Sequence, residues 1–217
     1  MNRPVNIEQN TLNNILVWVA QLGDNIQNTS EKVQKIQEQT GVFRKITDRE
    51  LEAMLTTGAP RTVSMLENNA FIYLPPAKKG DCFVPILCVE YDYAIEMPKL
   101  SLKIALFHIS ENDDKRPLQA IGYRFETSHE QERHHYCHIQ HINGFGHSDR
   151  YKLPGTEWVP MEYPAFPIDA QNPIELLVCL LVSLYDLDII NDLKGEFKTL
   201  IEAHIKKMRL FKFVTKI

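Results

Sequence analysis

The chain has 217 residues and a formal net charge of −4, with 44% hydrophobic and 24% charged residues. This composition is ordinary for a folded globular protein and excludes disorder for most of the chain. The acidic balance gives no general attraction to nucleic acid or to an anionic membrane, so binding of that kind needs a local basic patch. Residues 1–10 are polar rather than apolar, which is unlike a secretory signal peptide and predicts a cytoplasmic location.

The first sixty residues predict helices. Apolar residues recur at helical spacing over 8–22: Leu12, Ile15, Leu16, Val19 and Leu22. A second helix is expected from Thr29 or Ser30 to Thr40, with a narrow apolar seam of Val33 and Ile36. Thr47 and Glu50 have the spacing of a capping box, which predicts a third helix running through Leu55.

From residue 70 the pattern changes to β. Five segments are rich in β-branched and aromatic residues and end in turn signals: 70–74, 86–95, 100–109, 118–127 and 134–142. The connections between them are short, which favours an antiparallel meander over parallel crossovers. We therefore expect a central sheet of four or five strands.

The last third predicts a long loop and two helices. The proline-punctuated segment 144–172 is expected to be functional or to pack over the sheet. Residues 173–187 form a strongly apolar helix, too short to span a bilayer, and 191–213 form an amphipathic one. The predicted fold class is α+β, with helices 1–60 and a core domain 70–217 in one compact unit, and both C-terminal helices packed on the sheet.

Six of the eight histidines lie between residues 129 and 147, around a predicted β-hairpin. Strand alternation places Arg124 and Glu126 on one face of 118–127, and His134 and His138 on one face of the returning strand. A loop centred near residue 130 would set Arg124 opposite Tyr136. The same register sets Glu126 opposite His134, and Gly122 opposite His138, where the glycine would leave room.

Two interpretations of this hairpin stay open. A guanidinium, a carboxylate and two imidazoles on one face could support acid–base cleavage of a phosphodiester, with Arg124, Glu126, His134 and His138 as catalytic residues. Alternatively, Glu126 and His134 form a cross-strand ion pair, and Arg124 packs on Tyr136. The second interpretation needs no function.

No metal site or cofactor is expected. On a strand, His134 and His138 are about 13 Å apart, too far to share one ion. Cysteines 82, 88, 137 and 179 lack CxxC spacing and predict reduced, buried thiols; Cys137 on the apolar face is a structural thiol rather than a nucleophile. The 163–170 segment could be a binding lid, although Phe166 is expected to plug the core.

The two ends of the chain suggest partners. Lys206, Lys207, Arg209 and Lys212 make the C-terminal helix basic, which is typical of a contact with nucleic acid or an acidic partner, or simply of a solvated helix end. The narrow seam of the second N-terminal helix stabilises little alone, so a protein partner or a second copy is expected to dock on the N-terminal helices.

The sequence Tyr-Arg-Phe-Glu at 123–126, a histidine-rich strand and the Pro-Ala-Phe-Pro loop at 164–167 resemble small bacterial proteins of toxin or defence operons. The resemblance is confined to that segment and contains no established catalytic motif. The leading functional hypothesis is a non-catalytic accessory or interaction subunit of a bacterial multi-protein assembly, related to antiviral defence or toxins and associated with nucleic acid. The alternative is a metal-independent nuclease.

Overall fold

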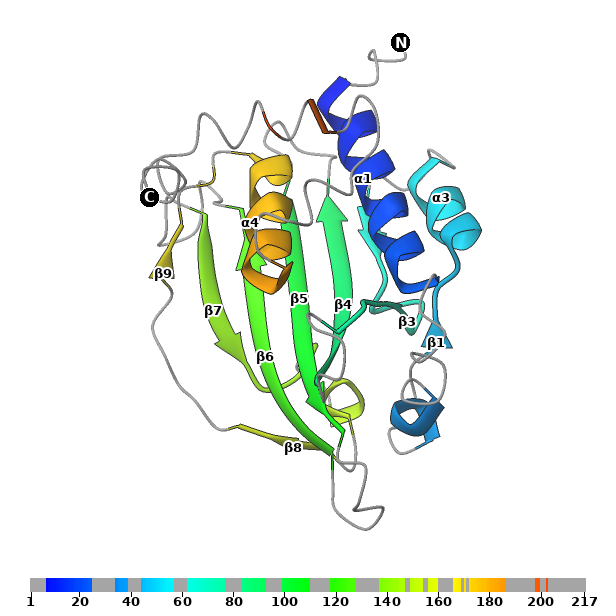
Figure 1. Ribbon diagram of the computed structural model, residues 1–217, viewed down its shortest axis with the longest axis vertical. Coiled ribbons are helices and arrows are strands. Elements are labelled where there is room, and N and C mark those ends of the chain that lie inside the picture. Colours follow the sequence, from blue (N-terminus) through cyan, green and yellow to red (C-terminus); the bar gives the residue numbers. More distant parts are fainter. Residues whose placement is uncertain are drawn as a thin grey trace.

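A computed structural model describes residues 7–24, 34–38, 44–56, 62–76, 83–92, 99–109, 118–127, 137–146, 149–153, 156–159, 166–168, 170, 172–185, 198–199 and 202 (Figure 1). The helices are α1 (Ile7–Asp24), α3 (Asp48–Thr56), the 3-10 helix η1 (Asp149–Lys152) and α4 (Pro173–Tyr185). The strands are β1 (Arg44–Lys45), β2 (Thr62–Ser64), β3 (Ala70–Tyr73), β4 (Phe83–Asp92), β5 (Lys99–His108), β6 (Leu118–Glu126), β7 (His138–Ile142), β8 (Thr156–Trp158) and β9 (Phe166–Pro167).

The strands form a mixed, mostly antiparallel sheet in the order β1-β3-β4-β5-β6-β7-β9, and β2 and β8 pair with β4 and β6. The predicted antiparallel meander is confirmed for β4 to β7. The predicted count of four or five strands is wrong, because the described sheet has nine. The four unforeseen strands are only two or three residues long, which is too short for a period of two to show in a sequence.

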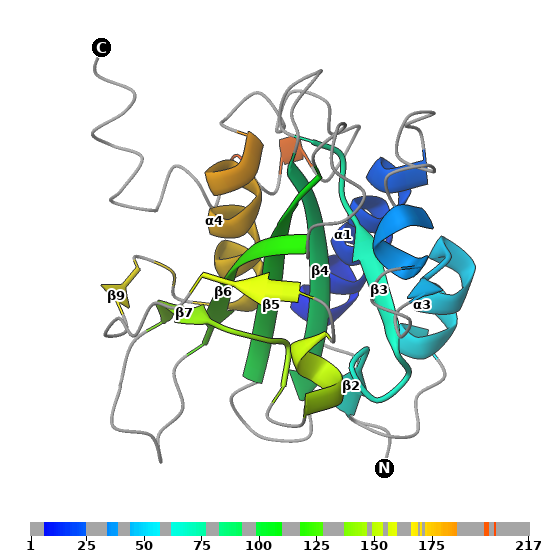
Figure 2. The same ribbon diagram turned by 90° about the horizontal axis from the view of Figure 1, so that it is seen from below.

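The two faces of the sheet differ because side chains alternate along each strand. One face carries residues such as Leu87, Leu102 and Ile104, all fully or nearly fully buried. Helix α4 packs over β5 and β6, with α1 beside it against β3 (Figure 1). Figure 2 shows α4 and η1 on opposite sides of the sheet.

Part of the second face is covered by the segment that follows β7. Phe145 lies against Phe71, with 5.0 Å between ring centroids, and Trp158 lies against Phe107 at 6.2 Å. Phe145 and Trp158 also contact each other edge to face. The 144–172 segment therefore packs over the sheet in its described part, which is one of the two outcomes predicted for it.

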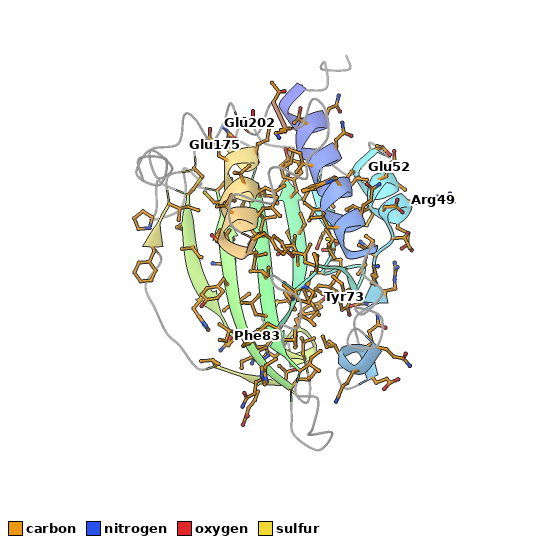
Figure 3. All side chains as sticks on the ribbon, viewed as in Figure 1. Arg49, Glu52, Tyr73, Phe83, Glu175 and Glu202 are labelled. Carbon is orange, nitrogen blue, oxygen red and sulfur yellow. The ribbon has the colours of Figure 1, made fainter. Side chains whose placement is uncertain are left out.

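The predicted helices at 8–22 and at 173–187 are confirmed over their described residues. In α1, Leu12, Leu16 and Val19 are buried, as the helical spacing requires. Helix α4 begins after Asn172, whose Oδ1 accepts a hydrogen bond from the backbone N–H of Glu175 in the first turn at 2.9 Å. Glu175 is labelled near one end of α4 in Figure 3. No helix in the described parts of the chain is long and apolar enough to cross a membrane.

The capping box at the start of α3 is formed as predicted. The N–H of Glu50 donates to Thr47 Oγ1 at 3.2 Å, and the N–H of Thr47 donates to Glu50 Oε2 at 3.0 Å. Arg44 adds an ion pair to Glu50 at 2.9 Å. These contacts lower the pKa of Glu50, first through the Thr47 backbone hydrogen bond and then through Arg44.

The second N-terminal helix is described only at 34–38, which is helical. Its apolar residue Ile36 is 1% exposed and belongs to the core of this chain. Val33, the other residue of the seam, lies outside the described residues, so docking of a partner or a second copy on the N-terminal helices stays a prediction. Most of the predicted helix 191–213 lies outside the described residues, of which 198–199 and 202 are helical.

Candidate functional site

The register of the β6–β7 hairpin differs from the predicted one. Glu126 lies opposite His138 rather than His134, and Arg124 lies opposite Gln140 rather than Tyr136. Gly122 lies opposite Ile142 rather than His138. The partner of Glu126 is thus four residues further along the chain, because the connection between β6 and β7 is longer than a hairpin centred at residue 130 allows.

The register is shifted by an even number of residues, so each side chain of β7 stays on the face of the sheet that was predicted for it. A slip of one residue would move every side chain of β7 to the other side of the sheet, whereas a slip of four returns each to its original side. Arg124, Glu126 and His138 therefore share a face, as the sequence predicted. His134 and Tyr136 lie outside the described residues.

Glu126 is the centre of this cluster. Its Oε2 lies 3.0 Å from Nε of Arg124 and 3.5 Å from Nε2 of His138. The contact with Arg124 is close, but Nε has no aligned hydrogen-bond acceptor, so the interaction is an ion pair. One carboxylate oxygen is thus shared by a guanidinium and an imidazole.

Burial is uneven across the cluster. The His138 side chain is 2% exposed and that of Glu126 is 8% exposed, whereas that of Arg124 is 27% exposed. A buried carboxylate needs charged or hydrogen-bonded partners, and Arg124 and His138 supply them. Only Arg124 reaches solvent to a substantial extent.

The same face continues onto β5 and β4 with further polar residues. Ser101 lies opposite Glu126 and also opposite Glu90, while Lys103 lies opposite Arg124. Lys103 Nζ forms an ion pair with Glu90 Oε2. Ser101 is 5% exposed, and its Oγ has no hydrogen-bond partner in the described structure.

Lys103 and Ser101 were not predicted as members of this face. The signal was present, because each lies two residues along its strand from another polar or charged residue. Period-two alternation identifies the residues of one strand that share a face. It does not show which strand lies beside which, or in what register.

Gly122 does not leave the room that was predicted. A Cβ there would lie 2.7 Å from Ile142 Cγ1 and 2.8 Å from Trp158 Cζ3. Trp158 comes from β8, far from the hairpin in sequence, and fills the space above the glycine. The space above Gly122 is therefore filled by packed protein.

His141 lies on the opposite face of β7. Its ring packs edge to face on Tyr123 at 5.3 Å between centroids. Both ring nitrogens are buried and have no hydrogen-bond partner in the described structure. Desolvation by burial lowers the pKa of this histidine below its usual value of 6.5.

The cysteine prediction is confirmed for the three thiols that the structure describes. Cys88, Cys137 and Cys179 are buried and form no disulfide among the described residues. Burial raises the pKa of the Cys88 thiol strongly, and the nearby Glu90 adds to the effect. A thiol held in its protonated form is a poor nucleophile. Among the described residues no group of three histidine, cysteine or acidic side chains is placed to hold a metal ion.

The prediction for Phe166 is wrong. It was expected to plug the core, but it is 54% exposed and is the only exposed large hydrophobic residue among those described. Phe166 lies on β9, which pairs with β7 through Ile139 and His138. Strand β9 is the end of the described sheet, at the left edge of the molecule in Figure 1.

The basic C-terminal residues proposed as a contact surface, Lys206, Lys207, Arg209 and Lys212, all lie outside the described part of the chain. Their role stays a prediction. Comparison with known proteins found no matching family model, no matching curated protein and no matching solved structure.

Proposed function

We propose that this chain is a non-catalytic interaction subunit that binds another protein at the β9 edge of its sheet. The observation that carries the proposal is the exposure of Phe166 on a terminal strand. Aromatic residues are enriched at protein interfaces, and a strand edge offers backbone N–H and C=O groups to an incoming chain. Pro167 beside it limits the backbone pairing, so the side chain of Phe166 supplies the main contact.

The burial of the polar cluster supports a binding role over a catalytic one. A general acid or base must come within hydrogen-bond reach of its substrate. At 2% and 8% side-chain exposure, His138 and Glu126 face each other rather than an open surface. Their mutual contact stabilises the hairpin to which β9 is paired.

Site-specific photocrosslinking tests the proposal. A photoreactive phenylalanine analogue at position 166 is expected to crosslink one protein of defined mass in the native host. The same analogue at Glu157, an exposed position on β8, is the matched control. Equal crosslinking from both positions, together with a monomeric purified protein, would exclude a specific interface at β9.

The alternative function is a metal-independent nuclease. Arg124 and His138 both contact one carboxylate oxygen of Glu126. This arrangement favours the nuclease function, since these residue types perform acid–base cleavage of phosphodiesters. In this case the buried His138 and Glu126 become accessible when substrate binds.

RNA and single-stranded DNA incubated with the purified protein in EDTA discriminate between the two functions. If the nuclease proposal holds, cleavage falls at least about 100-fold in His138→Ala and in Glu126→Gln. His108→Ala, a half-buried histidine at the other end of β5, is the control and retains activity. No cleavage by a well-folded sample leaves only the binding role.

A further inference from the structure

We infer that Arg124 is the anchor of an oxyanion-binding site on the polar face of the sheet, and that Glu126 and His138 position it. The ligand is a singly charged oxygen-acid anion, such as a carboxylate or a phosphodiester. This inference goes beyond the proposed binding role and does not depend on it, because the site lies on β6 and not on β9.

The orientation of the guanidinium is the first step of the argument. An arginine side chain carries five N–H donors in a planar fork. Glu126 Oε2 holds the Nε side of that fork at 3.0 Å, and His138 contacts the same oxygen from the neighbouring strand. The ion pair keeps the Nε side of the guanidinium beside Glu126, and among the described residues no ion pair engages its two Nη groups.

The Nη groups are the available donors. Among the described residues Arg124 has no ion pair other than the one with Glu126. Nε is buried beside that carboxylate, and the side chain as a whole is 27% exposed. Two parallel N–H groups match the two oxygens of a carboxylate or phosphate group.

The neighbours on the same face set the charge of the ligand. Lys103 and Gln140 flank Arg124 on β5 and β7, directly opposite it in the two registers. The charges of Lys103 and Arg124 are balanced by those of Glu90 and Glu126. The cluster is therefore close to neutral. A ligand with one negative charge beside Arg124 is repelled less by Glu90 and Glu126 than a ligand with two negative charges.

Gln140 provides the second, neutral contact. It is half-buried, lies about 5 Å from Arg124 between Cα positions, and carries an amide that can donate two hydrogen bonds. The amide adds no charge to the cluster. Arg124 and Gln140 together form a donor pair on adjacent strands.

The Nε–Hε resonance of Arg124 in a ¹⁵N NMR spectrum reports directly on this site. Dimethyl phosphate and acetate are titrated separately at constant ionic strength, with sodium chloride as the reference. A saturable shift of the Arg124 signal with at least one of the two anions is expected, and the one that saturates at lower concentration identifies the ligand class. The Arg44 signal serves as the matched internal control, since that guanidinium is bound to Glu50 through Nη1.

Variants separate the anchor from the residues that position it. Arg124→Gln abolishes saturable binding, measured by calorimetry with the same two anions. Arg124→Lys keeps the charge but loses the fork, and we expect about a tenfold loss of affinity. Glu126→Gln, checked for folding by its amide spectrum, frees the guanidinium and weakens binding by a similar factor. A shift no larger than that of Arg44, or calorimetric binding unchanged in Arg124→Gln, overturns the inference.

Discussion

His138 lies directly opposite Glu126 across the β6–β7 hairpin, with its Nε2 atom 3.5 Å from Oε2 of the carboxylate. Both side chains are buried, and Arg124 contacts the same oxygen. A buried carboxylate between two nitrogen-bearing groups is stable only as a complete set, because removing one member leaves the others without compensation in a poorly solvated place.

Replacing Glu126 with alanine should therefore destabilise the fold. We expect the free energy of unfolding to fall by about 2–4 kcal/mol, since His138 and Arg124 lose their shared acceptor. Urea denaturation followed by circular dichroism measures the change. Glu52→Ala on the exposed side of α3 is the control and should change stability by less than about 0.5 kcal/mol. Equal effects of the two variants would contradict a structural role for the cluster.

Adding one methyl group at Gly122 should also destabilise the protein. The new Cβ would lie within 3 Å of Ile142 and Trp158, which belong to two different strands. Overpacking of this kind costs about 1–3 kcal/mol, and thermal unfolding of Gly122→Ala measures it. Gln119→Ala, an exposed change on the same strand, is the comparison. A Gly122→Ala protein as stable as the wild type would mean that Trp158 does not pack there.

His141 should make stability depend on pH. Its pKa is lowered in the folded state, so the unfolded chain takes up a proton first as pH falls. The contribution is complete above the unfolded pKa of about 6.5 and is lost as pH falls from there towards the lower folded value. His141→Phe should flatten the stability profile between pH 7 and pH 5, whereas His108→Phe is the matched control. An unchanged slope in His141→Phe would show that this ring is not the cause.

The capping box of α3 gives a test of local stability. Thr47→Ala removes the hydroxyl that accepts the Glu50 N–H, and we expect a loss of about 1 kcal/mol in the free energy of unfolding. Thr47→Ser retains the acceptor oxygen and should restore most of the stability. If alanine and serine behave alike in chemical denaturation, the cap contributes nothing.

Phe166 should separate binding from folding. Because the side chain is 54% exposed, Phe166→Ser is expected to change stability by less than about 0.5 kcal/mol. Under the proposed function, the same change removes the interaction with the partner. Co-purification of the partner that the photocrosslinking experiment identifies measures this loss. Substantial unfolding in Phe166→Ser would show instead that the ring supports the β7–β9 pairing.

The face composition of the hairpin was predictable, and its register was not. Alternation alone placed Arg124, Glu126 and His138 on one side, because side chains on a strand have a period of two. The pairing partners depended on the length of the connection, which the sequence pattern did not define. The predicted register was wrong by four residues, an even number, so each side chain stayed on its predicted face. Three of the four proposed residues are therefore together despite the wrong register.

The sequence by itself determined the local elements: the α1 stripe, the Thr47 capping box, the apolar helix α4 and the order of the long strands. These depend on spacing and capping within a few residues. Only the tertiary structure decided that Trp158 fills the space over Gly122, that Ile36 joins the core and that Phe166 stays outside it. Each of these outcomes depends on contacts between segments far apart in the chain, and periodicity within one segment carries no information about them.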